Sequence, residues 1–298
     1  MDIKLRNKLY DRGFYIIGLC VTLIGIVVLL TLLIDVTLDG LSRLGWQFLT
    51  HYPSRKPYEA GVLSAWVGTV WIAVLTLLIA FPLGMSAATF LEEYSKKNWF
   101  MGLIEINIAN LSAVPSIIYG LLGLELFVRG MNMERSVISG ALTLAILILP
   151  LIIISTREAI RAIPSTIREA SYALGATKWQ TVRNQILPAA MPSILTGTIL
   201  AISRAIGEAS PLIMIGALTY VAFLPTSPIS SEFPYISFKG LFDPFTVLPI
   251  QIFNWVSRPQ KGFWEDAAAG IIVLLIIVFF MNGIATYLRY RYEKRVRW

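Results

Sequence analysis

The sequence has very few of the residues that soluble enzymes use for chemistry and for surface solubility. Its 298 residues include one cysteine, Cys20, and one histidine, His51, and only 14% of them are charged. A single cysteine excludes an intrachain disulfide, and Cys20 lies in an apolar stretch, where a buried and inert thiol is expected. His51 lies in a loop, where a solvated side chain is expected rather than a metal ligand.

Motifs for nucleotide binding and metal-dependent hydrolysis are also absent. The sequence contains no phosphate-binding loop of the Gly-x-x-x-x-Gly-Lys-Ser/Thr type, no His-Glu-x-x-His and no cysteine cluster. We therefore expect no catalytic activity, no metal and no cofactor in this chain. If the protein uses ATP and Mg²⁺, a separate subunit must bind them.

The sequence is instead rich in apolar residues, which make up 56% of it and give a mean hydropathy of +0.69. A helix needs about 20 apolar residues to cross a bilayer. Six stretches come close to or exceed this length, and they predict an all-α integral membrane protein with six transmembrane helices: 14–34, 62–90, 103–128, 137–154, 194–224 and 267–288.

The basic residues predict the orientation of these helices. A net charge of +7 could suggest nucleic-acid binding, but the Lys and Arg residues flank the apolar stretches. Of the 25, sixteen lie on the side of the termini, eight on the other side, and Arg204 lies within a span. Basic residues favour the cytoplasm. The counts predict a plasma (inner) membrane protein with both termini cytoplasmic, in contact with lipid and not with nucleic acid.

Two regions are expected. Residues 1–60 would form an N-terminal anchor helix with a periplasmic loop, and residues 61–298 a membrane core that includes a cytoplasmic loop, 157–192. In this loop, Thr166 and Glu169 have the spacing of a helix capping box. We expect a short helix over Ile167–Leu174, ended by Gly175 because glycine readily adopts a left-handed conformation.

A second loop helix is expected from Thr177 to Leu187, closed by Pro188 and Pro192. The first helix is too short to be stable alone. Three interpretations remain open for its apolar face: a cytoplasmic partner covers it, it folds back onto the chain's own helices, or it lies among lipid headgroups. That face carries Ala170, Ala173 and Leu174.

A charged pair lies in the fifth predicted span. Arg204 and Glu208 are four residues apart, so they would share one helix face. Arg204 is about eleven residues from the inner helix end, which at roughly 1.5 Å per residue places it near the middle of the bilayer. The pair would either line the path of an anion or form a structural ion pair or a lock between subunits. One arginine cannot neutralise a dianion, so a second subunit should supply more positive charge.

Two hydroxyl groups in the third span are weaker candidates. Ser116 and Tyr119 follow Pro115 in a stretch that is unusually polar for a membrane span. Their hydroxyls could hydrogen-bond an anion in the path, or they could bond to nearby helix carbonyls while Pro115 kinks the span.

The cytoplasmic loop resembles the EAA loop of ABC-importer permeases. This chain has Ser171 where that family has an alanine, and Gln185 where it has an isoleucine. The resemblance implies a type I ABC importer permease fold and a coupling role toward an ATPase for Glu169, Ala170, Ser171, Gly175, Leu187 and Pro188.

Three further segments are similar to PstA-type phosphate permeases: Arg204–Leu212, Val114–Gly120 and Phe245–Ile252. This resemblance implies one half of a pore for inorganic phosphate. It also implies a second, PstC-type permease, a dimer of PstB-type ATP-binding subunits and an extracytoplasmic PstS-type phosphate-binding protein. The alternatives are a permease for another oxyanion such as phosphonate or molybdate, a passive anion channel, and a membrane enzyme that acts on a lipid phosphate.

Overall fold

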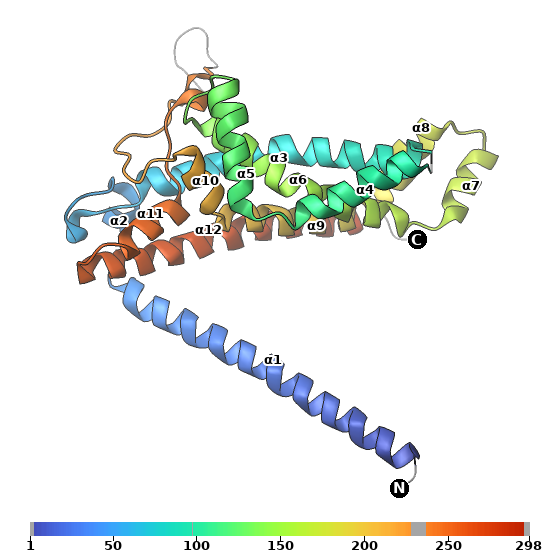
Figure 1. Cartoon of the computed structure of the whole chain (residues 1–298), viewed down its shortest axis with the longest axis horizontal. Helices are drawn as coiled ribbons and strands as arrows, with labels where there is room; N and C mark the ends of the chain where they lie inside the picture. The colour runs from blue at the N-terminus through green and yellow to red at the C-terminus, as the bar shows by residue number, and fades with distance from the viewer. Residues whose placement is uncertain (1–2, 97, 228–236, 295–298) are drawn as a thin grey trace.

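The protein is described by a computed structural model that covers residues 3–96, 98–227 and 237–294. Five long helices dominate it (Figure 1), namely α1 (Ile3–Leu41), α3 (Leu63–Thr89), α6 (Val137–Arg161), α9 (Leu187–Gly207) and α12 (Lys261–Glu293). Shorter helices connect them: α2 (Trp46–Thr50), η1 (Pro57–Glu59), η2 (Phe90–Tyr94), α4 (Trp99–Ser112), α5 (Ser116–Gly123), η3 (Leu124–Gly130), α7 (Ser165–Ala173), α8 (Lys178–Thr181), η4 (Val182–Ile186), α10 (Ser210–Ile215), η5 (Lys239–Phe242) and α11 (Leu248–Val256).

The predicted six spans are present, although one of them is bent. Five helical segments of the described chain are long and apolar enough to cross a membrane, and α4 with α5 and η3 makes a sixth if the bent pair counts as one span. The two parts of this pair meet at 104°. Pro115 lies at the bend with an extended backbone, φ −56° and ψ 136°. In Figure 1, α5 consequently points away from the direction of α4.

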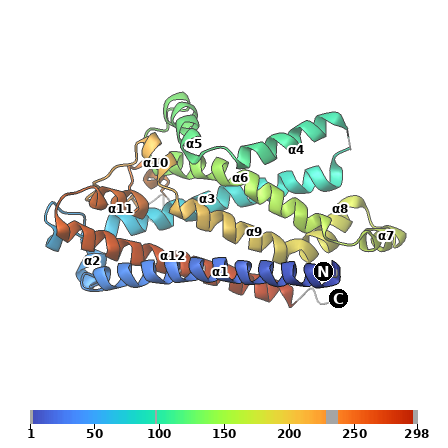
Figure 2. The same ribbon diagram turned by 60° about the horizontal axis from the view of Figure 1, so that its bottom comes forward.

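The core consists of α3, α6 and α9, which lie side by side in Figure 2 and are called the three-helix core below. Small residues allow their backbones to approach closely. A Cβ atom added at Gly84 of α3 would lie 2.6 Å from the Ile152 side chain of α6. One added at Gly197 of α9 would lie 2.3 Å from Ser155 of α6. The three helices therefore pack as one unit.

The start of α1 and the end of α12 lie at the same end of the molecule as α7 and α8, and α2 and α11 lie at the opposite end (Figures 1 and 2). Both ends of the chain thus share a side with the EAA-like loop, as an even number of spans requires. That this side faces the cytoplasm stays a prediction from the distribution of basic residues.

The predicted capping box in this loop is wrong. The residue that caps α7 is Pro164, and no side chain caps the helix there. The capping box lies instead at the start of α8, where the Thr177 hydroxyl accepts from the Gln180 N–H and the Gln180 side chain accepts from the Thr177 N–H. Pro164, whose ring fixes φ, directly precedes the helix. Because proline has no side-chain acceptor, α7 starts without a side-chain cap.

The predicted end of the second loop helix is also wrong. The chain continues from α8 through the π-helical turn η4 directly into α9, past both Pro188 and Pro192. Pro188 lies just after the π-helical turn η4, and the chain stays helical through it. The helix therefore leads without a break from the loop into the membrane.

Helix α1 is attached to the rest of the chain only near its C-terminal end. Its apolar stretch is unburied along its length, and Figure 1 shows it diverging from the bundle. Cys20 is exposed on this helix, so the described chain does not itself bury the thiol, and its expected burial would have to come from the membrane around this span. At the attached end, a Cβ atom on Gly40 would lie 2.7 Å from the backbone nitrogen of Ala269 in α12.

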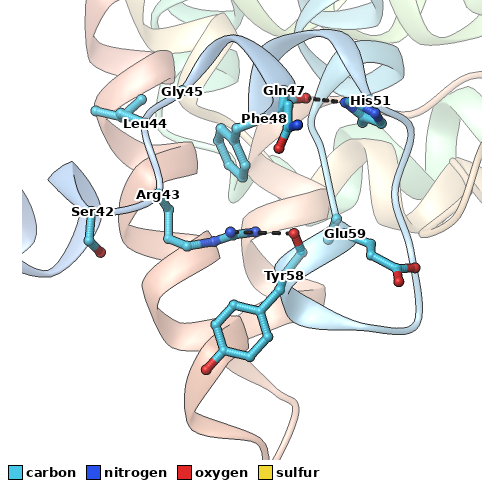
Figure 3. A pocket seen from close by; sticks show the side chains of 10 residues that line it. Ser42, Arg43, Leu44, Gly45, Gln47, Phe48, His51, Tyr58 and Glu59 are labelled. Carbon is cyan, nitrogen blue, oxygen red and sulfur yellow. Dashed lines mark hydrogen bonds between the residues drawn. The ribbon is translucent and has the colours of Figure 1, made fainter.

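A buried ion pair completes this attachment. Arg43 Nε donates to Asp266 Oδ1 at 2.7 Å, and the Asp266 side chain is fully buried. The guanidinium also donates to the Pro57 and Tyr58 carbonyls, the second of which Figure 3 shows. Arg43 borders the pocket of about 360 Å³ drawn there. His51 also lines this pocket, and its Nδ1 lies 2.7 Å from the Gln47 carbonyl oxygen.

We predict that Gly40→Leu loosens this attachment, because the new side chain would displace a backbone. Overpacking of this kind costs about 1–3 kcal/mol. Hydrogen exchange of the Arg43 and Leu44 amides, which donate to the Gly40 carbonyl, should become faster. Gly25→Leu is the matched control, since a Cβ atom there meets nothing within 4 Å. Equal exchange in the two variants would contradict the prediction.

Candidate functional site

The fifth predicted span is interrupted at the charged pair. Helix α9 ends at Gly207, Glu208 has extended backbone angles of φ −84° and ψ 112°, and α10 begins at Ser210. Pro211 explains the break, because a proline lacks the N–H that would bond to residue 207 and its ring clashes with that carbonyl. The expected single helix with both charges on one face is therefore wrong.

The two charges nevertheless remain close. Arg204 Nε lies 3.6 Å from Glu208 Oε1, and the side chains are 47% and 21% exposed. At this distance the two side chains form an ion pair, but the nitrogen and the oxygen are too far apart for a hydrogen bond. Within the described residues the Arg204 guanidinium makes no hydrogen bond, so its donors are available to another group. Arg204 is in the last turn of α9, where the helix dipole favours a cation.

Arg204 lies on the face of α9 that is turned away from the core. Ala201, Ile202 and Ala205 pack into the core. On the opposite face, Leu200 and Arg204 are exposed, and a Cβ atom added at Gly207 would meet nothing within 4 Å. An arginine that faces hydrocarbon is expensive, so protein or water must cover this face in the membrane.

The segment with the two hydroxyl candidates packs against α10. A Cβ atom on Gly120 of α5 would lie 2.7 Å from both Met214 and Pro211. Tyr119 is buried, and its hydroxyl donates to the Leu111 carbonyl of α4 at 2.6 Å. This bond spans the bend between α4 and α5, and it uses the phenol proton. Ser116 is half-buried at the first position of α5.

The EAA-like residues form two groups. Glu169 and Ala170 are exposed on α7, and the Ser171 hydroxyl lies 2.8 Å from that of Thr181. Gly175 ends this segment with φ +83°, as its position predicted. Leu174 is 89% exposed, and α7 contains no buried residue. The face that carries Ala170, Ala173 and Leu174 therefore does not fold back onto the chain's own helices.

Leu187 and Pro188 are apart from this exposed face. They form the first turn of α9, and Leu187 packs on a cluster that includes Ile160 and Ile186. Ile167 of α7 packs on the same cluster. These residues thus connect the loop to the membrane helices, whereas Glu169 to Gly175 form its outer surface.

Sequence reasoning missed a group of ion pairs at this end of the molecule. Glu92 of η2 bonds to Arg161 at 2.9 Å, and it lies 3.4 Å from Arg157. Arg157 also bonds to Glu105 of α4 at 2.6 Å. The neighbouring Glu93 bonds to Arg168 of α7 at 2.6 Å. The signal was a Glu-Glu pair in the turn after the second span and several arginines in the loop after the fourth, but no sequence spacing shows which side chains meet.

The family profile named "Binding-protein-dependent transport system inner membrane component" matches residues 80–298. The chain belongs to this family of transporter permeases. The match includes the bent pair α4–α5, the loop with α7 and α8, and the break after Arg204, so every candidate site residue lies inside it.

Curated relatives agree with this assignment. The chain is 34% identical over 284 residues to "Probable ABC transporter permease protein YqgI" of Bacillus subtilis, covering 94% of each chain. It is 29% identical over 297 residues to "Phosphate transport system permease protein PstA 1" of Mycobacterium tuberculosis, covering 99% of this chain and 91% of the relative. It is 28% identical over 276 residues to "Phosphate transport system permease protein PstA" of Yersinia pestis, with coverages of 92% and 88%.

Solved permeases show the same fold. A bacterial ABC transporter involved in the import of the acidic polysaccharide alginate matches with a TM-score of 0.65 and 15% identity, covering 97% of this chain and 99% of that one. An inward-facing form of the MetNI methionine ABC transporter matches with a TM-score of 0.57 and 16% identity, with coverages of 78% and 95%. The predicted type I ABC importer permease fold is thereby confirmed.

We predict that Tyr119→Phe weakens the α4–α5 bend without changing which anion is transported. The substitution removes one hydrogen bond to the Leu111 carbonyl, and a buried hydrogen bond contributes about 1 kcal/mol. Thermal unfolding of the purified chain should occur at a lower temperature. Competition between anions in uptake assays should be as in the native protein, and an altered anion preference would instead assign the hydroxyl to the path.

Proposed function

We propose that this permease forms half of the translocation path of an ATP-driven importer of inorganic phosphate. The observation that carries the proposal is the Arg204–Glu208 pair, which is exposed at the helix break where the candidate span Lys178–Gly207 ends. Intramembrane ionisable residues of this kind mark substrate paths. The relatives named as phosphate transport permeases support phosphate as the substrate.

The chemistry of the pair suits hydrogen phosphate. Arg204 supplies positive charge and unused N–H donors, and Glu208 supplies an acceptor. Hydrogen phosphate still carries a proton at neutral pH and can donate it to a carboxylate, whereas sulfate carries none. The carboxylate would therefore repel sulfate more than phosphate. Ser116 and Tyr119 lie on α5, which packs against α10 after the break, and Ser116 would add a hydroxyl to the path.

A second permease must complete the path, because one arginine cannot neutralise a dianion. The unburied face of α9 around Arg204 is where a PstC-type subunit would face this one. A PstS-type protein would deliver phosphate at the other end of the molecule from α7. Both termini of the chain would then be cytoplasmic, in the plasma (inner) membrane.

The exposed face of α7 would contact one subunit of a PstB-type ATPase dimer. Those subunits would bind ATP and Mg²⁺, and this chain would hold no cofactor. ATP binding would bring two such loops together, and the halves of the membrane core would rock as bodies around the central site. Glu169, Ala170, Ser171 and Gly175 would form the contact surface, and Leu187 and Pro188 would carry its motion into α9.

The proposal is tested by ATP-dependent uptake of labelled phosphate into vesicles that hold this chain with its co-purified partners. Arg204→Ala should lower uptake about tenfold or more, because hydrogen bonds to charged groups contribute about 1.5–3 kcal/mol. Leu200→Ala is the matched control, since Leu200 lies on the same exposed face one turn away and carries no charge. It should leave uptake unchanged.

Excess sulfate should not compete in the native assembly, and it should compete in Glu208→Gln. Equal uptake by Arg204→Ala and the native chain, with the assembly intact, would reject the substrate-path role of Arg204. No phosphate uptake by an assembly that hydrolyses ATP would move the substrate to another oxyanion.

A further inference from the structure

Glu93 and Arg168 connect α7 to the membrane helices, and this contact is called the Glu93–Arg168 link below. Arg168 donates to Glu93 Oε1 through Nε at 3.0 Å and through Nη2 at 2.6 Å. Its Nη1 donates to the Ile163 carbonyl at 2.8 Å, and Nη2 also donates to the Ile160 carbonyl at 3.1 Å. One guanidinium therefore joins α7, the end of α6 with the turn after it, and η2.

This link is well shielded from water. The side chain of Glu93 is 7% exposed and that of Arg168 is 21% exposed. The neighbouring pair of Glu92 and Arg161 is different, because Arg161 is 63% exposed. Exposed ion pairs contribute little, whereas removing one partner of a shielded pair leaves an unpaired charge. The guanidinium also has a rigid planar shape, so its four contacts fix the direction of α7.

Few other contacts orient α7. It has no buried residue, Ile167 is half-buried against the cluster of Ile160 and Ile186, and the Ser171 hydroxyl lies 2.8 Å from that of Thr181 at the end of α8. In the described residues, the Glu93–Arg168 link is the only ion pair between α7 and a membrane helix or its extension. The orientation of α7 therefore depends strongly on this contact.

The link leads directly into the three-helix core. Glu93 lies in η2, which continues α3 with helical backbone angles at Phe90. α3 packs closely on α6 at Gly84, and α6 packs closely on α9 at Gly197. α9 in turn carries Arg204 at its other end. A force applied to α7 at Arg168 thus reaches both α3 and α6.

We propose that the Glu93–Arg168 link is the positioning contact through which movement of α7 displaces the three-helix core. Neither side chain touches the transported anion, and both act through the orientation of α7. The proposal rests on the proposed contact between α7 and the ATPase. It assigns the transmission of that contact to two residues outside the EAA-like set.

The test compares Arg168→Gln and Glu93→Gln with Arg161→Gln in the assembled complex in vesicles. Arg161→Gln is the matched control, because it removes an exposed arginine that pairs with the neighbouring Glu92. Both link variants should continue to hydrolyse ATP. The amount of phosphate imported per ATP hydrolysed should fall about fivefold or more, which is the lower end of the factors typical of coupled sites. The control should keep the native ratio. The variant that carries both Arg168→Gln and Glu93→Gln should import as much phosphate per ATP hydrolysed as either single variant.

Arg168→Lys separates charge from geometry. Lysine keeps the charge but lacks the planar set of donors, so its ratio should lie between the native and Arg168→Gln values. A native ratio in Arg168→Gln would overturn the proposal. Equal losses of assembly, hydrolysis and uptake in both link variants would also overturn it, because the link would then only maintain the fold of the loop.

A distance measurement tests the link without reference to the substrate. With Cys20→Ser in the background, spin labels at the exposed residues Thr166 and Lys96 report the position of α7 relative to the end of η2. The distance distribution should broaden in Arg168→Gln and stay native in Arg161→Gln. An unchanged distribution in Arg168→Gln overturns the link. Failure of the native assembly to import phosphate contradicts only the proposed substrate.

Discussion

The position of one arginine inside a membrane span constrains the rest of this structure. Arg204 cannot face hydrocarbon at an acceptable free energy, and the chain does not bury it. The break that Pro211 imposes exposes Arg204 beside Glu208 on one face, and the opposite face packs into the three-helix core. Protein or water must cover the exposed face in the membrane, as the proposed second subunit of a larger pore would do.

The same helix connects the two parts of the molecule. From α8 through η4 to the end of α9, the chain runs without interruption from the exposed loop to Arg204. Ion pairs add lateral connections, a shielded one from α7 to η2 through Glu93 and a more exposed one from α6 to α4 through Glu105. A movement at the exposed loop can therefore reach the charged pair through helices that pack as a unit, without a flexible linker.

The sequence predicted the features that depend on local chemistry. Apolar length predicted the spans, and the need for a left-handed residue predicted the role of Gly175. The first capping box was predicted wrongly, because α7 already begins at Ser165 after Pro164 and Thr166 lies inside the helix, whereas Thr177 precedes α8 and caps it. The Glu93–Arg168 link joins residues 75 positions apart, and such a pairing follows from the fold alone.

The central claim is that the exposed face of α7 contacts the ATPase subunit, and site-specific photo-cross-linking tests it most directly. A photoreactive amino acid at Leu174, which is 89% exposed, would be activated in the native assembly, with Trp46, 80% exposed at the opposite end, as the control position. The account predicts a cross-link from position 174 to the ATPase subunit and none from position 46. A cross-link from position 174 only to lipid or to this chain would contradict it.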